Sequence, residues 1–108
     1  MEEKGALAGT LSLSGIIEYQ DDAVVSKIVL KKSTGSVTVF AFDQGQELSE
    51  HTVPHDALVQ VFDGEAQITI SGEEHRVMAG EMIVMPGNQP HAVKASERFK
   101  MLLIMIRS

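Results

Sequence analysis

Short apolar runs separated by turn-forming residues extend along most of the chain. Residues 66–70 alternate apolar and polar side chains, and this period of two is typical of a half-buried strand. The predicted strands are residues 23–30, 37–42, 57–62, 66–70, 75–78, 82–85 and 99–106. Asp63-Gly64 and Ser71-Gly72 predict turns between strands, because these residue types favour tight turns. This spacing of strands and turns predicts an all-β barrel or sandwich.

The chain has 108 residues, enough for one domain with its own hydrophobic core. We expect a single domain over residues 1–108, in which residues 1–13 form a flexible tail, a helical turn or an edge strand. The chain contains no cysteine, and this excludes disulfides, thiolate nucleophiles and cysteine-ligated zinc.

The charge and the hydropathy of the chain narrow the range of partners. A formal net charge of −6 argues against nucleic acid or an anionic membrane surface as a partner. The first residues are acidic and no continuous apolar run follows them, so we expect no signal peptide. No stretch has the apolar length that a bilayer span needs. We therefore expect a cytoplasmic protein that has no membrane partner.

Two segments place a histidine at a fixed distance after a glycine. Gly45 is followed by five residues and then His51, and Gly80 is followed by five residues, Pro86 and then His91. The two histidines are 40 positions apart in strand-like sequence, so their imidazoles can meet only if the sheet rolls up. This geometry predicts a ligand or metal pocket inside a small β-barrel.

The same segments resemble the paired motifs of the cupin superfamily. The first cupin motif is glycine, five residues, His-x-His, three or four residues, glutamate, six residues, glycine. The second is glycine, five residues, proline, x, glycine, two residues, histidine. The matching positions are Gly45, His51 and Gly64 in the first motif and Gly80, Pro86 and His91 in the second, with Asn88 in place of the inner glycine. The resemblance covers residues 36–106 and implies a double-stranded β-helix, or jelly-roll, barrel.

The resemblance also implies a metal site. Metal-binding cupins use both histidines of the first motif, its glutamate and the histidine of the second motif as ligands. Here His51 and His91 occupy two of these four places, and they would bind a divalent transition metal such as iron, manganese, nickel or zinc. Val53 occupies the second histidine place and Ala57 the glutamate place.

Two nearby residues are possible substitutes for the missing ligands. His55 would share a strand face with His51 if the strand were regular, so we predict His55 as a third metal ligand. Pro54 weakens that assumption, because proline often marks a bend or an edge. Gln60 follows His55 at the longer cupin spacing and is predicted as a pocket residue, a poor ligand but a fair hydrogen-bonding group. In the alternative interpretation, the histidines form hydrogen bonds in a pocket without metal.

The later strands are rich in methionine. Met82 and Met101, together with Met105, are predicted to line a soft pocket that accepts an apolar small molecule, although ordinary core packing would explain them as well. His75 lies among charged residues and is predicted to be solvated. Residues 100–106 begin with a lysine and otherwise offer apolar side chains at both strand parities. Since one face of that strand needs an external cover, we expect a homodimer.

Three functions are compatible with this pattern. The chain is a metal-dependent dioxygenase or isomerase of the cupin type, a metal-free module that binds or senses a small molecule, or a non-catalytic scaffold. The first needs a metal held by His51, His55 and His91. The second needs only a cavity with hydrogen-bonding groups. One barrel hosts many activities, so the site must decide between them.

Overall fold

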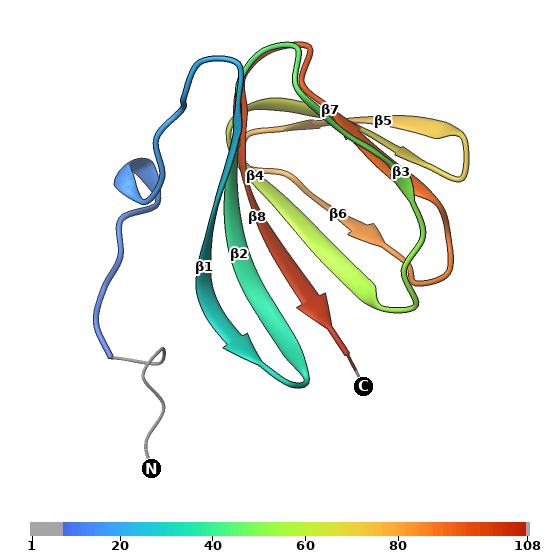
Figure 1. Cartoon of the computed structure of the whole chain (residues 1–108), viewed down its shortest axis with the longest axis horizontal. Helices are drawn as coiled ribbons and strands as arrows, with labels where there is room; N and C mark the ends of the chain where they lie inside the picture. The colour runs from blue at the N-terminus through green and yellow to red at the C-terminus, as the bar shows by residue number, and fades with distance from the viewer. Residues whose placement is uncertain (1–7, 108) are drawn as a thin grey trace.

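Runs of β-branched and aromatic residues form a strongly curled antiparallel sheet in the computed structural model, which describes residues 8–107 (Figure 1). The strands are β1 (Val24–Lys32), β2 (Gly35–Phe42), β3 (Glu47–His51), β4 (Asp56–Ile70), β5 (Glu73–Met78), β6 (Met82–Met85), β7 (His91–Lys94) and β8 (Phe99–Ile106). A single 3-10 turn, η1 (Leu13–Gly15), precedes them. The prediction of an all-β barrel is confirmed. The expected N-terminal tail lies partly outside the described residues, since residues 1–7 are not among them.

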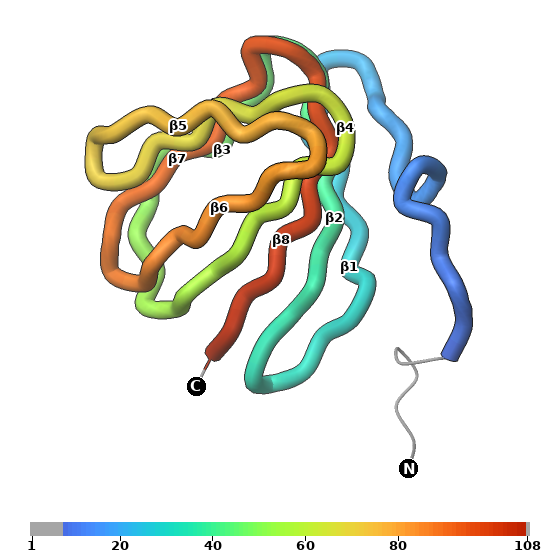
Figure 2. Tube along the Cα trace, turned by 180° about the vertical axis from the view of Figure 1, so that it is seen from behind, coloured from blue at the N-terminus to red at the C-terminus, as the bar shows by residue number. Residues whose placement is uncertain are grey.

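Strand β4 joins two facing layers. Its first half pairs with β6 and β8, and these strands continue through β2 to β1 in layer A. Its second half pairs with β5 and β7, and β7 pairs in turn with β3 to form layer B. Figures 1 and 2 show the two layers curling toward each other from their shared strand. The space between the layers is therefore the interior of the barrel.

The predicted turn at Asp63-Gly64 is wrong. Residues 57–62 and 66–70 belong to one strand of 15 residues, β4, with an irregularity in its pairing to β8 between Val61 and Asp63. Gly64 has a φ of 71°, and here its freedom bends a continuous strand from one layer into the other instead of closing a hairpin. The sequence signal for positive φ was correct, but its structural consequence was different.

The main core lies between the two layers. Phe42 on β2 and Phe99 on β8 stack with ring centroids 4.5 Å apart, and both side chains are fully buried. Val59, Val61 and Ile68 on β4 face the same space and are also fully buried. Alternate residues along β4 thus fill the interior, as the period of two requires. This packing holds apart the two walls that carry the candidate site.

The N-terminal segment covers part of the outer face of layer A. Ile17 is buried there against Val39. The Tyr19 hydroxyl donates a hydrogen bond to Asp63, and the guanidinium carbon of Arg98 lies 4.4 Å from the centroid of the tyrosine ring. Burial, and then the bond to Asp63, raise the pKa of Tyr19. Residues 16–19 therefore act as a cover for this end of the sheet.

The rest of that outer face carries an apolar row. Each of the five strands of layer A contributes one apolar residue to this row, and each residue is the direct cross-strand partner of the next. The row consists of Leu30, Val37, Ile104, Leu58 and Val84. Val84 is 59% exposed and Leu30 38% exposed.

Among residues 8–107, no helix is long and apolar enough to cross a membrane.

Candidate functional site

His51 and His91 meet inside the barrel, as the spacing of the two glycine–histidine segments predicts. They are direct cross-strand partners, with His51 at the end of β3 and His91 at the start of β7. Their ring centroids lie 4.4 Å apart and their planes make an angle of 66°. His91 is buried, whereas His51 is exposed to solvent. The pair therefore connects the interior with the rim of the barrel.

Backbone hydrogen bonds determine the tautomer of both rings. Nδ1 of His51 donates to the carbonyl oxygen of Ser49 at 2.9 Å, and Nδ1 of His91 makes a longer contact of 3.4 Å with the carbonyl oxygen of Gln89. A carbonyl oxygen only accepts, so each neutral ring carries its proton on Nδ1. Each Nε2 consequently keeps an available lone pair. The pair can accept two hydrogen bonds or supply two metal ligands.

The surroundings of His91 favour its neutral form. Burial lowers the pKa of His91 below the ordinary histidine value, and the neighbouring His51 lowers it further, while the bond to Gln89 opposes both effects. Burial has this effect because a charged imidazolium loses its hydration. Protonation of both rings at once is therefore unfavourable. The neutral pair instead suits a hydrogen-bond donor or a metal ion, each of which uses nitrogen lone pairs.

This pKa shift predicts how stability depends on pH. The folded chain holds a proton on His91 less tightly than the unfolded chain, so its free energy of unfolding falls as the pH drops through the ordinary pKa of histidine. We expect His91→Asn to flatten the loss of stability between about pH 7.5 and about pH 5.5, and His51→Ala to flatten it in part. Urea unfolding across this range measures the effect. An unchanged slope in His91→Asn would contradict it.

The pair opens onto a small cavity of about 50 Å³ between the layers, which is room for only a few water-sized atoms. Apart from the two imidazoles its lining is apolar. The lining residues are Leu48, His51, Val53, Ala57, Met85, His91, Val93, Met101, Leu103 and Met105. Within residues 8–107, no acidic side chain lines this cavity. The site is therefore an apolar chamber with two nitrogen lone pairs at one side.

The two missing cupin ligand places belong to this same cavity. Val53 and Ala57 both line it, together with His51 and His91. In layer A, Ala57 lies between two direct cross-strand partners, Met85 on β6 and Met105 on β8. Met85 is almost fully buried. Where the family pattern has a carboxylate, this chain has a methyl group flanked by two thioethers.

The structure places three of the six predicted site residues in the cavity: His51, His91 and Met101. His55 lies past the end of β3, in a segment that packs against Gly87. The strand stops at His51, so His55 does not share its regular parity. In the same segment, the carbonyl of Val53 accepts a 2.7 Å hydrogen bond from the backbone of Asn88.

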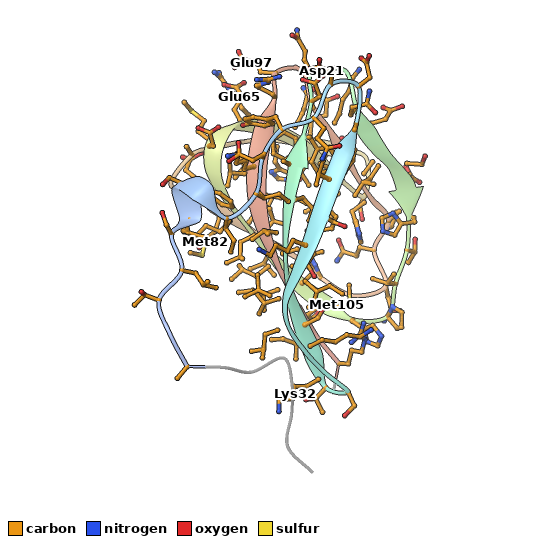
Figure 3. The ribbon with its side chains drawn as sticks, turned by 60° about the vertical axis from the view of Figure 1, so that its left-hand side comes forward. Asp21, Lys32, Glu65, Met82, Glu97 and Met105 are labelled. Atoms are coloured by element: carbon orange, nitrogen blue, oxygen red, sulfur yellow. The ribbon has the colours of Figure 1, made fainter. Side chains whose placement is uncertain are left out.

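Gln60 and Met82 lie on the opposite side of layer A. Gln60 alternates with Val59 and Val61, which are fully buried inside, so its side chain faces outward. Met82 is the direct partner of Gln60 and is 58% exposed. Figure 3 labels Met82 and Met105, which come from different faces of the sheet. Neither Gln60 nor Met82 lines the cavity.

The donor set does not fit the resident divalent metal that the resemblance implies. Within the described part of the chain, no three histidine, aspartate, glutamate or cysteine side chains converge in a way that could hold a metal ion. Glu73 lies in the same cross-strand row as His91, but Ile70 separates them, which puts them two strand spacings, or about 10 Å, apart. Two imidazoles alone do not make the open site of two histidines and one carboxylate.

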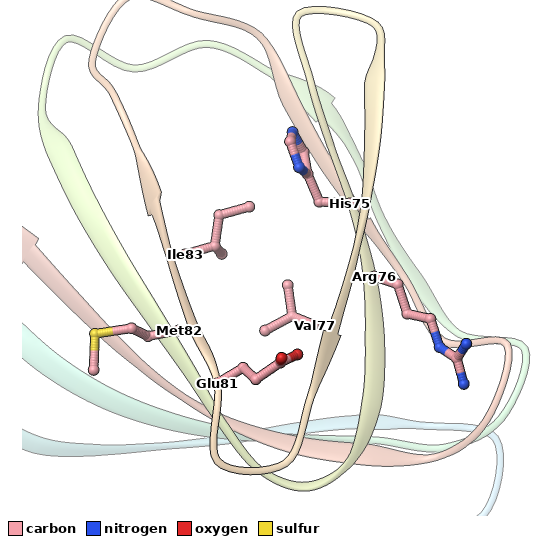
Figure 4. A pocket seen from close by; sticks show the side chains of 6 residues that line it. All are labelled: His75, Arg76, Val77, Glu81, Met82 and Ile83. Carbon is pink, nitrogen blue, oxygen red and sulfur yellow. The ribbon is translucent and has the colours of Figure 1, made fainter.

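A second hollow lies between β5 and β6. Figure 4 shows His75, Val77, Glu81 and Ile83 facing this crevice, while Arg76 points away from it. His75 is the direct partner of Ile68, whose side chain is in the core, so it lies on the inner face of β5. Glu81 accepts a hydrogen bond from the backbone of Met78 at 2.9 Å, and this bond stabilises the turn before β6.

Sequence reasoning missed Met85 as a cavity residue. Met82, Ile83, Val84 and Met85 are all apolar, so their alternation carries no signal for the inner face. Pairing with Ala57 decides it, because Ala57 and Met85 share one face of layer A. The sequence identifies Met85 only indirectly. Ala57 occupies a ligand place of the first motif, and a residue that pairs directly with it also faces the interior.

Comparisons with known proteins agree with this geometry. The family model described as Cupin domain matches residues 38–107. A conserved protein of unknown function from Streptococcus pyogenes is 38% identical, with a TM-score of 0.89, and the match covers 95% of this chain and 90% of that chain. A Cupin 2 conserved barrel domain protein from Leptotrichia buccalis is 41% identical, with a TM-score of 0.86, over 90% of this chain and 47% of that chain.

A cupin superfamily protein from Desulfitobacterium hafniense DCB-2 is similar over almost its whole length. It is 25% identical with a TM-score of 0.88, and the match covers 98% of this chain and 97% of that chain. No protein of curated function matches. These three relatives share the fold, and their names specify no substrate.

Proposed function

Since this chain belongs to the cupin family, whose domain model covers residues 38–107, we propose that it is a binding module rather than a metal-dependent enzyme. One observation carries the proposal: the interior cavity offers two imidazole lone pairs in an otherwise apolar lining. Such a lining suits recognition of a small guest, with the imidazoles orienting it and the apolar wall excluding water.

The lining argues against the oxygenase or isomerase alternative. A metal-dependent reaction of the cupin type needs a third protein ligand, and Val53 and Ala57 supply none. General acid–base catalysis needs a group whose pKa lies near the working pH and which reaches the reacting atom. Burial lowers the pKa of His91, so its ring is a weaker base than an ordinary histidine, and within residues 8–107 no carboxylate lines the chamber to act with it.

Methionine methyl groups provide a direct test of binding. We expect an occupant of the cavity to shift the ¹³C-methyl resonances of Met85, Met101 and Met105, which line it, and to leave those of Met78 and Met82 unchanged. The last two are internal controls because they are 46% and 58% exposed outside the cavity. The screen uses the smallest alcohols and amines, and the ions of iron, manganese, nickel, zinc, copper and silver.

Two substitutions complete this test. His51→Ala should weaken every genuine response of the three cavity methyl groups, because it removes one acceptor while leaving the core intact. Gln60→Ala, on the outer face of β4, should leave the responses unchanged. Shifts that are equal at Met82 and Met101, or that persist in full without His51, would contradict the proposal.

We further propose that the chain is a homodimer that buries the outer apolar row of layer A. The row Leu30–Val37–Ile104–Leu58–Val84 crosses the whole sheet, and a two-fold axis brings such a row against a copy of itself. Soluble monomers rarely expose a large contiguous apolar patch. A second copy would cover the face that the strand 99–106 leaves unpartnered inside the chain.

A pair of matched variants tests this assembly. Val84→Glu should convert the dimer into a monomer at micromolar concentration, because a charge in the contact loses its hydration without gaining a partner. Ile28→Glu should leave the dimer intact. Both residues are 59% exposed, but Ile28 lies on the opposite face of the sheet by register. Light scattering gives the mass, and a monomeric parent protein would overturn the proposal.

A further inference from the structure

The donors around the cavity come from both layers and are chemically alike in one respect. Layer B supplies the imidazoles of His51 and His91 from one cross-strand row. Layer A supplies the thioethers of Met85 and Met105, which flank Ala57 in another row, while a third thioether, that of Met101, lines the cavity further along β8 beside Val61. The two imidazoles and the thioethers of Met85 and Met105 all line the same cavity, and each of them offers a lone pair in its uncharged form. This juxtaposition is absent from the four-ligand cupin pattern, which includes a carboxylate.

Direct cross-strand partners bring the two sulfur atoms within reach of one point. Side chains of adjacent partners have Cβ atoms about 5 Å apart, and Ala57 between the two methionines takes up little of that space. Methionine is unbranched and flexible, so its sulfur can adapt its position within an irregular cavity. Because Ala57 has only a methyl side chain, the space that a glutamate fills in the cupin pattern is open to these two sulfur atoms.

We infer that this cavity is a binding site for a soft monovalent metal ion, cuprous copper, with His51 and His91 as nitrogen ligands and Met85 and Met105 as sulfur ligands. The inference rests on the proposed function of the chain as a binding module and names the class of its guest. Thioethers are soft ligands that suit Cu(I), and imidazole binds copper as well.

Charge explains why the ion is monovalent. The cost of moving an ion from water into an apolar chamber rises with the square of its charge. A divalent ion in this chamber would keep its full charge, because the four donors are neutral. A monovalent ion with neutral ligands carries a much smaller penalty. The same absence of carboxylates that disfavours iron or manganese here therefore favours Cu(I).

The hydrogen bonds of the two histidines already suit this role. Metal-ligating histidines usually donate their other ring N–H to a carbonyl or carboxylate, which orients the ring. Ser49 and Gln89 provide these carbonyls, so Nε2 of each ring is the available ligand. The rings contact edge to face in the structure. Joint coordination therefore needs a rotation about the side-chain torsions, for which the more exposed His51 has room.

Anaerobic titration with Cu(I) against the chromophoric competitor bicinchoninate tests the inference. We expect about one Cu(I) per chain, and affinity at least about tenfold lower in His51→Ala and in Met85→Leu/Met105→Leu. Leucine keeps the methionine volume, so the fold should survive. Met78→Leu/Met82→Leu, which removes two methionines outside the cavity, should retain the parent affinity. Zn²⁺ and Mn²⁺ should not compete.

Silver ion and X-ray absorption separate the possible outcomes. Ag⁺, a redox-inert substitute for Cu(I), should shift the methyl resonances of Met85 and Met105, and copper absorption spectra should contain sulfur scattering. Failure to retain Cu(I), equal retention of Zn²⁺, or unchanged affinity in the Met85/Met105 variant would each overturn the inference. If a small organic molecule shifts the cavity methyl groups but Cu(I) and Ag⁺ do not, the binding function stands and the copper site falls. If neither a small organic molecule nor a metal ion shifts the cavity methyl resonances, both the binding function and the copper site are wrong.

Discussion

Val53→His combined with Ala57→Glu should convert this barrel into a tight site for divalent metal. Both positions line the cavity that holds His51 and His91, so the double variant would complete three imidazoles and one carboxylate around one point. We expect affinity for Mn²⁺ or Ni²⁺ to rise by roughly a thousandfold, since two ligands and one negative charge are added. Calorimetric titration of the parent and the variant measures the change.

The control for this gain places a carboxylate on the same strand but outside the cavity. Gln60→Glu adds the same charge to β4, and its side chain faces outward beside Met82. This variant should bind divalent ions no better than the parent. If the double variant folds and still fails to bind, then Val53 and Ala57 do not occupy the ligand places that the resemblance assigns to them.

Gly64→Ala should be the most destabilising single substitution among the motif glycines. A Cβ at this position would lie 2.1 Å from the carbonyl oxygen of Arg98, which is backbone and cannot turn aside. The residue also has a φ of 71°. We expect a loss of at least about 3 kcal/mol in the free energy of unfolding, from overpacking together with the strained φ. Urea denaturation gives this value, and an insoluble product agrees with it.

Gly80→Ala provides the matched comparison for Gly64→Ala. Gly80 has a φ of 93°, but a Cβ there meets no atom within 4 Å. Its substitution should therefore cost only the strain of the left-handed conformation, about 1–2 kcal/mol. Equal losses in the two variants would show that the contact with Arg98 is unimportant and that φ alone explains the glycines at these two positions.

Much of this fold follows from local sequence, because the motif residues have local causes. The prolines and glycines of the two segments set turns, and the strand over residues 99–106 matches β8 at both ends. Asn88, which departs from the second motif, has a φ of 65°. Asparagine tolerates this left-handed region better than most residues. The turn therefore keeps its shape without the inner glycine, and His91 reaches the place that the motif predicts.

What local sequence did not determine was side-chain direction and strand continuity. Gln60 was assigned to the pocket from its distance to His55, yet strand parity turns it outward. The sequence predicts Met82 and not Met85 as a pocket residue; residues 82–85 are apolar throughout, and only the pairing with Ala57 distinguishes the two. Asp63-Gly64 has the residues of a hairpin but lies inside β4, whose partners come from distant parts of the chain. These outcomes depend on register, which no short window contains.

The two strands that carry the imidazoles differ in the number of strands with which they pair. In the part of the chain that the structure describes, β3, which carries His51, pairs only with β7, whereas β7 pairs with both β3 and the long strand β4. Local opening takes the least free energy where a strand has one partner and few buried side chains, and β3 is exposed at four of its five residues. Detachment of β3 would separate His51 from His91 while the rest of the barrel stays folded. Opening of β3 would therefore give a bound guest a way out of the cavity. We expect the backbone amides of this strand to show the fastest hydrogen exchange.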